Sequence, residues 1–496
     1  MREVKNGRKF LFLSLLFSAV ALLLATSPGY SLISEAREWE DNIPLPFLRS
    51  TEDQLLDSTF RIDISTIAVT FDYFPWEYYV DCRAVVEFTM RPGQTRAVIH
   101  LAPAIRNTNV VSSASLNGEV LNFSDEADVR IISFEGTTQQ AFEFQRHLEA
   151  DTVHTLDISY RLTLPPGYPR FSSKVHDLQG RGNEEWFPTI NTPHELARHF
   201  LTFRVHSDTA FRCIGSGLVE ETVSDVRQWS LDTEREIASY TVMFALMPEE
   251  DTIFEERMIG EVPVRIMAFV GGASIDTAFA RLQQWLPELE TNLGPFPMPR
   301  GLSIFLVSSG GGMEYYGGTI TALGPLEHEV FHLYFGCSTV NKTYRDSWMD
   351  EAISVWYENS LDPAYPPIPD NYTSNIVSGR SAIAVGFDRR AYNEGARIIE
   401  AVARELGGRN EMIAFLSYLH RNYSFTPFTT FDFLDFLEEY SNVDMTGRFL
   451  NWLYMGSENG YAPNPSSPHW IDKKKPDMTP PRELLKKYGI NKRRTK

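Results

Sequence analysis

Two histidines stand four residues apart at His328 and His332, with Glu329 between them. If this segment is a helix, both imidazoles project from the same face, one turn apart, and can reach a single metal ion. Imidazole nitrogen binds zinc at about 2.0–2.1 Å, so the pair supplies two zinc ligands. Glu329 is one step round from His328 and lies beside the ion, where a general base for a zinc-activated water belongs.

A zinc site that does chemistry has three protein ligands and one open position, so a third ligand is needed. Glu351 fits this role, since 18 residues separate it from His332 in the sequence. Ser347 and Asp350 match a capping box, which predicts a second helix with Glu351 in its first turns. Two helices joined by a short loop can bring Glu351 back to the histidine pair.

Each of these residues also has an ordinary explanation. An H-E-x-x-H pattern arises by chance in roughly 1% of chains of this length. Glu351, taken alone, is more simply an exposed carboxylate on a helix. The histidine pair and Glu351 together favour a metal site, because chance would otherwise have to explain the residue types and the spacing at once.

Local signals predict the elements that must position these residues. Pro325 suits the first turn of the histidine helix, and Gly336 suits its end. Before this helix, residues 274–294 have apolar side chains at helical spacing, interrupted at Pro287. Residues 301–307, "GLSIFLV", form a short apolar run that predicts a buried strand.

Helical patterns dominate the chain beyond Glu351. The segment from Tyr392 to Leu406 is amphipathic and stops at a pair of glycines, Gly407-Gly408. Thr429 and Asp432 match a capping box that predicts the start of another helix.

Residues from about 50 to 250 instead show the two-residue alternation of β-strands. The segment "LDISYRLTL" at 156–164 alternates apolar and polar side chains, which predicts a strand with one solvated face. Further candidates are "FRIDI", "CRAVVEFTM", "RAVIHLA" and "HFLTFRV". We expect an antiparallel β domain in this part of the chain.

The residues around the metal ligands resemble a known family. "HEVFHLYFGCSTV" is similar to "HELAHQWFGNLVT", and "WMDEAISVW" is similar to "WLNEGFA", with the same 18-residue spacing between the second histidine and the glutamate. The two segments used for comparison are those of the gluzincin metallopeptidases of the aminopeptidase N and leukotriene hydrolase type, which this chain therefore resembles. The resemblance implies one Zn²⁺ per chain, with His328, His332 and Glu351 as ligands and Glu329 as the catalytic base.

A second segment, "GGMEYYGG" at 311–318, resembles the G-A-M-E-N motif of the same family. The resemblance implies an edge strand that binds substrate through Gly311, Gly312 and Met313, with Glu314 on the free α-amine. A carboxylate at a fixed distance from zinc selects a cationic N-terminus and sets the scissile bond one residue away. Tyr315 stands where the family has asparagine.

A third segment, "AYNEGARIIEAV", resembles the family's "YEKGA" helix start and implies that Tyr392 stabilises the oxyanion of the reaction. Upstream, "NEEWFPTINTPHELARHFLTFRV" resembles the end of the family's β domain more loosely. From that side, Gln179 or Glu185 could approach the amine site.

The expected fold is therefore an α+β multidomain chain. It consists of an N-terminal antiparallel β domain at residues 50–254 and a thermolysin-like α/β zinc-peptidase domain at residues 255–455, whose C-terminal half is mostly helical. Only about 40 residues follow, so we expect a short form without the family's large helical C-terminal domain. Residues 461–496 are polar and then basic, and we expect them to be disordered.

The charge distribution argues against nucleic-acid binding. The net charge is −19. Residues 1–27 carry +3 and residues 472–496 carry +7, which leaves −29 for the body of the chain. A folded part this acidic does not offer a broad surface to phosphates.

The N-terminus has the features of an export signal. Four basic residues precede an apolar run of 16 residues from Phe10 to Ala25, and Ala25-Thr26-Ser27 resembles a cleavage site. We predict that residues 1–27 are a signal peptide, with a retained single-span membrane anchor as the alternative. The protein would then be exported, either secreted, periplasmic or membrane-anchored.

Three cysteines are few for an exported protein. A disulfide between Cys82 and Cys213 is one option, but small buried residues are the simpler interpretation. Cys337, just after the histidine helix, is expected to stay unpaired.

The predicted function is zinc-dependent release of N-terminal amino acids from peptides with a free N-terminus. One alternative is an exported zinc endopeptidase or other hydrolase that uses the same site. A second is a catalytically silent peptide-binding surface protein, although a pure binder has no need of a base such as Glu329. Side-chain preference and oligomeric state are not readable from the sequence.

Overall fold

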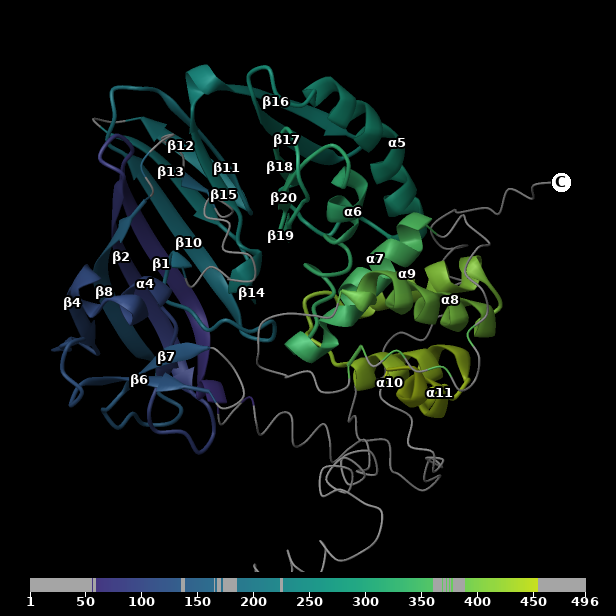
Figure 1. Ribbon diagram of the computed structural model, residues 1–496, viewed down its shortest axis with the longest axis horizontal. Helices are drawn as coiled ribbons and strands as arrows, with labels where there is room; N and C mark the ends of the chain where they lie inside the picture. The colour runs from purple at the N-terminus through teal and green to yellow at the C-terminus, as the bar shows by residue number, and fades with distance from the viewer. Residues whose placement is uncertain are drawn as a thin grey trace, which may run out of the picture.

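The computed structural model describes residues 59–134, 139–164, 185–223, 226–359 and 389–453, together with a few single residues and the pair Phe171–Ser172. The predicted signal segment at 1–27 and the predicted tail at 461–496 lie outside these residues. Figure 1 shows a β domain, coloured purple to teal, beside a second part with a smaller sheet and helices.

The β domain is built on a nine-stranded sheet. Its strands are β1 (Ile62–Phe74), β2 (Tyr79–Met90), β4 (Val111–Leu116), β5 (Glu119–Val120), β8 (His154–Thr163), β10 (Leu196–Val205), β12 (Leu218–Val223), β13 (Arg227–Asp232) and β14 (Ile237–Ala238). Their order is β12-β13-β10-β1-β2-β8-β4-β5, and β14 also pairs with β10.

The predicted two-residue alternation holds in this sheet. Along β8, buried and more exposed side chains alternate from His154 to Thr163, as expected for a strand with one solvated face. The pairs are antiparallel as predicted, except that β1 and β10 run parallel. A parallel neighbour needs a long crossover, and the chain between β1 and β10 supplies one.

Two three-stranded sheets complete the β domain. One contains β3 (Val98–Ile99), β6 (Val129–Ser133) and β7 (Gln140–Phe144), and the other contains β9 (Phe171–Ser172), β11 (Phe211–Gly215) and β15 (Phe244–Pro248). Short turns α4 (Ala102–Arg106), η1 (Thr108–Val110) and η3 (Ser239–Thr241) connect the strands. Phe71, Phe171, Phe203 and Phe244 pack together between the sheets, with ring centroids 4.9 to 6.2 Å apart.

A five-stranded sheet begins the second part of the chain. Its strands are β16 (Thr252–Ile259), β17 (Val262–Phe269), β18 (Leu302–Leu306), β19 (Glu314–Tyr315) and β20 (Gly318–Thr321). The order is β16-β17-β18-β20-β19, which places β19 at the edge. A single 3-10 turn, η4 (Glu249–Asp251), joins β15 to β16. The sheet therefore starts at Thr252, close to the predicted domain boundary.

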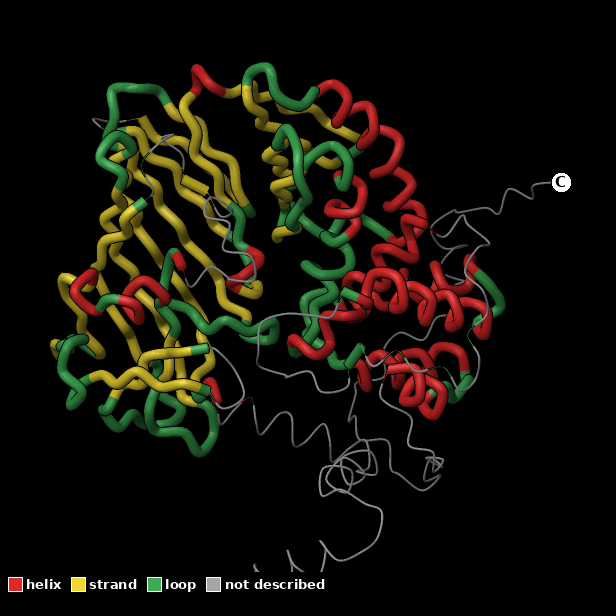
Figure 2. Tube along the Cα trace, in the orientation of Figure 1, coloured by secondary structure: helices red, strands yellow, loops and turns green. Residues whose placement is uncertain are grey.

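Helices cover this sheet and form the rest of the second part. They are α5 (Ile275–Leu293), α6 (Leu326–Phe331), α7 (Trp348–Asn359), α8 (Ala396–Glu405), α9 (Arg409–Tyr423), α10 (Thr430–Ser441) and α11 (Thr446–Leu453), with a 3-10 turn η5 (Tyr344–Ser347) and a π-helical segment η6 (Ala391–Gly395). Figure 2 shows the strands gathered on one side of the molecule and these helices on the other. The predicted α+β architecture is confirmed.

Two helix predictions need correction. The helix at 275–293 is not interrupted, because Pro287 lies within α5 on its exposed side. Its opposite side buries Leu282, Leu286 and Leu289 on both sides of the proline, so tertiary packing offsets the lost hydrogen bond. The histidine helix, predicted from Pro325 to Gly336, ends at Phe331.

Other local predictions are confirmed in the described residues. Thr429 and Asp432 form a capping box at the start of α10. Gly407 and Gly408, both at positive φ, follow the end of α8. The three cysteines are free, so Cys82 and Cys213 do not form a disulfide.

Within the described part of the chain, none of the helices has the length and apolar character needed to cross a bilayer.

Candidate metal centre and peptide site

The three predicted metal ligands converge on one point. His328 Nε2 lies 3.0 Å from His332 Nε2 and 3.2 Å from Glu351 Oε2, and the last two atoms lie 3.5 Å apart. Ligand atoms at about 2.0–2.1 Å from a tetrahedral zinc ion are separated by about 3.3 Å. The triangle therefore has the size that one zinc ion requires, and two nitrogens with one carboxylate oxygen form a suitable donor set.

The backbone explains this convergence. His328 lies in the middle of α6, while His332 caps its C-terminal end in αR conformation, so the two imidazoles still share one face. The chain then turns through η5 and enters α7, which carries Glu351 in its first turn. Because α6 and α7 pack against each other, the glutamate returns to the histidines as predicted.

Each imidazole also contacts a carboxylate outside the triangle of predicted ligands, and this contact orients the ring. His332 Nδ1 makes a short hydrogen bond to Asp350 and lies 3.1 Å from Ser354 Oγ. His328 Nδ1 lies 3.3 Å from Glu358 Oε2. A carboxylate on the outer ring nitrogen fixes the tautomer and leaves Nε2 free to bind a metal. Asp350 does not serve the predicted capping box with Ser347, since its carboxylate is directed at His332.

Replacing Asp350 with asparagine should weaken zinc binding about 10–100-fold, because His332 loses the anion that fixes its orientation. Chelator competition on the purified protein measures this affinity. Glu327→Gln is a matched control, because Glu327 lies on α6 but pairs with Arg281 rather than with an imidazole. If the Asp350→Asn protein binds zinc as tightly as the control, Asp350 does not orient His332 for metal binding.

The electrostatics of the ligands suit a cation. Burial by itself lowers the pKa of His328, but hydrogen bonds to Glu351 and Glu358 outweigh it and raise that pKa to about 9. Burial by itself raises the pKa of Glu351, but hydrogen bonds from both histidines outweigh it and lower that pKa to about 2. The cluster holds positive charge on its imidazoles, and a metal ion would displace those protons.

Glu329 is 5% exposed, and its carboxyl group lies against the backbone of Gly312. A Cβ atom added to Gly312 would lie 2.3 Å from the Glu329 carboxyl carbon. The predicted base and the predicted substrate strand are therefore in direct contact, and only glycine leaves room for that contact.

Gly312→Ala should lower kcat about 100-fold, because the added methyl group must push the base away from its position. Zinc content should not change, since no ligand moves. Steady-state kinetics with metal analysis distinguishes these effects. Gly324→Ala is the control, because a Cβ at Gly324 meets nothing within 4 Å and Gly324 is not a predicted site residue. Equal rates for the two variants would contradict this assignment.

Glu314 lies on the edge strand β19, so the predicted edge-strand position is confirmed for it. Gly311, Gly312 and Met313 directly precede this strand, and the binding of substrate by these residues stays a prediction. Glu314 lies close to the cluster, with a carboxylate oxygen within 4.8 Å of ligand atoms of His332 and Asp350. Burial raises the pKa of Glu314 to about 8, and the carboxylates of Asp350 and Glu329 add to this rise while His332 opposes it. A cationic group bound beside Glu314 would favour its ionised form.

Tyr315 explains how the strand is held without the family's asparagine. Its side chain is 5% exposed and packs in a second hydrophobic cluster with Met243 and Ile214 of the β domain. Since side chains alternate along a strand, Glu314 faces the cluster while Tyr315 anchors β19 in the seam between the two parts of the molecule.

Tyr392 lies in the π-helical segment η6, where its hydroxyl donates a 2.6 Å hydrogen bond to Glu351 Oε1. Gly395 permits this arrangement, since an added Cβ would lie 2.7 Å from Ala352 Cβ on α7. Single π-helical turns often mark functional positions. The Glu351 carboxylate therefore lies between the Tyr392 hydroxyl and the predicted metal position.

The sequence matches no protein-family model and no curated protein. Solved structures do resemble the chain. The M1 zinc metallopeptidase from Deinococcus radiodurans is 18% identical, with a TM-score of 0.60 over 81% of this chain and 96% of that one. A two-domain M1 zinc metallopeptidase variant bound to L-tryptophan is 16% identical, with a TM-score of 0.58 over 76% and 91% of the two chains.

Aminopeptidase A of Legionella pneumophila, solved with aspartic acid, is 13% identical, with a TM-score of 0.64 over 80% of this chain and 50% of that one. The chain has the fold of the M1 zinc metallopeptidases. Identities this low show the fold and not the activity. The match spans 91% of the two-domain neighbour but 50% of the Legionella enzyme.

Not every predicted residue joins the centre of this M1 fold. Gln179 lies outside the described residues. Glu185 is buried and forms a bidentate ion pair with Arg106 of the β domain, with distances of 2.6 and 2.8 Å. Its predicted approach to the amine site remains a prediction.

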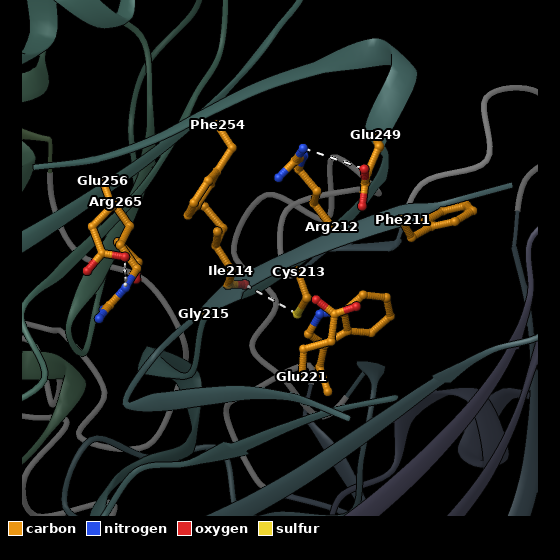
Figure 3. Close-up of a pocket in the computed structure, with 12 residues that line it drawn as sticks. Phe211, Arg212, Cys213, Ile214, Gly215, Glu221, Glu249, Phe254, Glu256 and Arg265 are labelled. Atoms are coloured by element: carbon orange, nitrogen blue, oxygen red, sulfur yellow. Dashed lines mark hydrogen bonds and ion pairs between the residues drawn. The ribbon is translucent and has the colours of Figure 1, made fainter. Parts of the chain in front are cut away.

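A separate cavity of about 220 Å³ lies at the seam of the M1 fold, between β11 and the five-stranded sheet (Figure 3). Its charged side chains pair with each other, as in the contacts Arg212–Glu249 and Arg265–Glu256. It contains none of the predicted site residues, so we do not associate it with the chemistry.

The sequence analysis missed Asp350 and Glu358 as partners of the histidines. A signal for Glu358 was present, because it follows Glu351 by seven residues, which is two helical turns on the same face. Asp350 was assigned to a helix cap instead, since its position also fits that pattern.

Proposed function

We propose that this chain is a zinc aminopeptidase that releases N-terminal amino acids from peptides. The observation that carries the proposal is the triangle of His328, His332 and Glu351 atoms, which matches one zinc ion and has the Glu314 carboxylate close to it. Glu329 lies next to His328 on α6. The M1 fold supports it, and solved neighbours with this fold are named zinc metallopeptidases and bind amino acids or a peptide.

His328, His332 and Glu351 would hold one Zn²⁺, which would supply Lewis-acid chemistry at the substrate carbonyl and lower the pKa of a water. Glu329 accepts a proton from the attacking water and later passes it to the leaving amine. The contact with Gly312 holds its buried carboxyl group in place for both steps. Tyr392 donates a hydrogen bond to the developing oxyanion, for which its hydroxyl must leave Glu351. Glu314 binds the free α-amine and fixes the distance to the scissile bond.

The proposal is tested with a panel of aminoacyl fluorogenic substrates, measured with and without a chelator. We expect turnover that is lost with the chelator and restored by zinc. A metal-replete protein that hydrolyses none of the substrates would contradict the proposal and favour a silent peptide-binding protein.

Amino-blocked peptides separate the aminopeptidase from an endopeptidase. Blocking removes the charge that Glu314 would bind, so we expect kcat/KM to fall about 100-fold, which corresponds to one lost charge-assisted contact of about 3 kcal/mol. Matched free and N-acetylated peptides of one sequence provide the comparison. Equal cleavage of both would assign the site to an endopeptidase.

We also propose that the catalytic part acts outside the cytoplasm. The support is the basic and then apolar pattern of residues 1–27. Mass spectrometry of the mature N-terminus tests it, because a signal peptide predicts a start near Ser27 and an anchor predicts an intact N-terminus on a membrane-bound protein. A full-length chain in the cytoplasmic fraction would contradict both.

A further inference from the structure

A buried carboxylate precedes the third predicted metal ligand. Asp346 lies in the 3-10 turn η5, five residues before Glu351, and is 3% exposed. The sequence analysis did not select it. Burying a carboxylate is costly unless hydrogen bonds satisfy its oxygens. The partners of Asp346 therefore show which elements this carboxylate joins.

Three hydrogen bonds satisfy the two oxygens of Asp346. Thr343 Oγ1, just before the turn, donates to Oδ2 at 2.6 Å. The backbone N–H and the hydroxyl of Thr430 both donate to Oδ1, each at 2.7 Å. Thr430 is the first residue of α10. The carboxylate therefore joins the turn before α7 to the start of a helix 84 residues further along the chain.

The directions of these hydrogen bonds are fixed by the chemistry of the groups. Trp348, the first residue of α7, donates from Nε1 to Thr430 Oγ1 at 3.0 Å. An indole N–H can only donate and a carboxylate can only accept, so the hydroxyl accepts from Trp348 and donates to Asp346. Residues on both sides of the junction between η5 and α7 thus hold the same hydroxyl.

The start of α10 is a firm support for this contact. Its capping box satisfies other groups of the first helical turn, and the Thr430 N–H is left to Asp346. An anion at the N-terminal end of a helix is also favoured by the helix dipole. Upstream, the N–H of Lys342 donates to the carbonyl of Phe428 at 2.8 Å. The chain between the second and third predicted ligands therefore lies along the segment that leads into α10.

We propose that Asp346 is a positioning residue for the metal centre. It sets the start of α7 against α10 and thereby holds Glu351 at the distance from the two histidines that one zinc ion requires. Glu351 lies in the first turn of α7, so a shift or rotation of that turn moves its carboxylate directly. The inference rests on the proposed function, because it assumes zinc at the triangle, but its test needs no turnover.

Two variants of Asp346 test this role in the full-length protein. Asp346→Ala removes all three hydrogen bonds. Asp346→Asn keeps them, because the amide oxygen can accept from Thr430 and the amide nitrogen can donate to Thr343. Glu143→Ala is the matched control. Glu143 is also 3% exposed and is ion-paired with more than one arginine, but it lies on β7 in the β domain.

Two properties are measured, the zinc affinity by chelator competition and the visible absorption bands of the Co²⁺-loaded protein, which report coordination geometry. We expect Asp346→Ala to bind zinc about 10-fold more weakly or worse and to change the cobalt bands, as is typical when support of a metal ligand is lost. Asp346→Asn should stay near wild type in both properties. Glu143→Ala should lower Tm but keep the wild-type affinity and bands.

Wild-type affinity and bands in Asp346→Ala would overturn the inference, as would an equal loss in Asp346→Asn or in Glu143→Ala. If Asp346→Ala does not fold, Thr430→Val and Thr430→Ser take its place. Valine removes the hydroxyl that joins Trp348 to Asp346, whereas serine keeps it. Weaker zinc binding only in Thr430→Val supports the inference, and equal binding by the two variants overturns it.

Failure of the proposed function gives a different result. A wild-type protein that binds zinc at the triangle but hydrolyses no substrate would reject the aminopeptidase, while the same affinities and cobalt bands still decide the role of Asp346. A wild-type protein that binds no zinc would reject both. The two failures are therefore distinguishable.

Discussion

Glu329→Gln is expected to lower kcat on aminoacyl substrates about 10³-fold while zinc stays bound, because the amide keeps the shape of the side chain but cannot accept the proton from water. Glu329 is not part of the ligand triangle, which consists of His328, His332 and Glu351. Its carboxyl group lies against Gly312, in the segment just before β19. Steady-state kinetics together with metal analysis measures both parts of this expectation.

The control for this variant is Glu327→Gln, on the same helix α6. Glu327 is partly exposed and contacts Arg281 at 3.5 Å, so its charge has no role at the centre. It should keep the wild-type rate. If Glu329→Gln hydrolyses the substrates at the rate of this control, Glu329 is not the base.

Glu351→Ala should abolish stoichiometric zinc binding and lower activity by about 10³-fold or more, since the metal supplies several kcal/mol of transition-state stabilisation. The carboxylate provides the only anionic atom of the triangle and also accepts the hydrogen bond from Tyr392. Its loss leaves two neutral imidazoles, which bind the ion weakly. Metal analysis after dialysis and the activity assay give the two results.

Thermal unfolding provides an independent comparison for the same variant. A ligand that binds only the folded state raises Tm, so a chelator should lower the Tm of the wild-type protein but not that of Glu351→Ala. A Glu351→Ala protein that retains one zinc per chain would exclude Glu351 as a ligand.

Glu358→Gln, which removes only the outer partner of His328, should keep zinc with about 10–100-fold lower affinity.

The centre could be predicted from the sequence because its spacing reflects helix geometry. Residues four apart share a helix face whether the helix is long or short, which is why the positions of His328 and His332 survive the early end of α6 at Phe331. Glu351 could be added because the residue types, the spacing and the flanking segments agreed together. The structure brings the three side chains within 3.5 Å of each other.

Contacts between distant segments could not be predicted in this way. The contact of Gly312 with Glu329 depends on how the segment before β19 lies along α6, and no local pattern encodes it. Local rules also gave the wrong result at Pro287, where burial of the opposite helix face outweighs the break that proline usually causes.

The most direct measurement of the central claim is the location of zinc in the purified, full-length protein. Anomalous X-ray scattering at the zinc edge should show one ion per chain, with His328 Nε2, His332 Nε2 and a Glu351 oxygen at about 2.0–2.2 Å from it. A protein without stoichiometric zinc, or with its zinc bound away from these three side chains, would contradict the account.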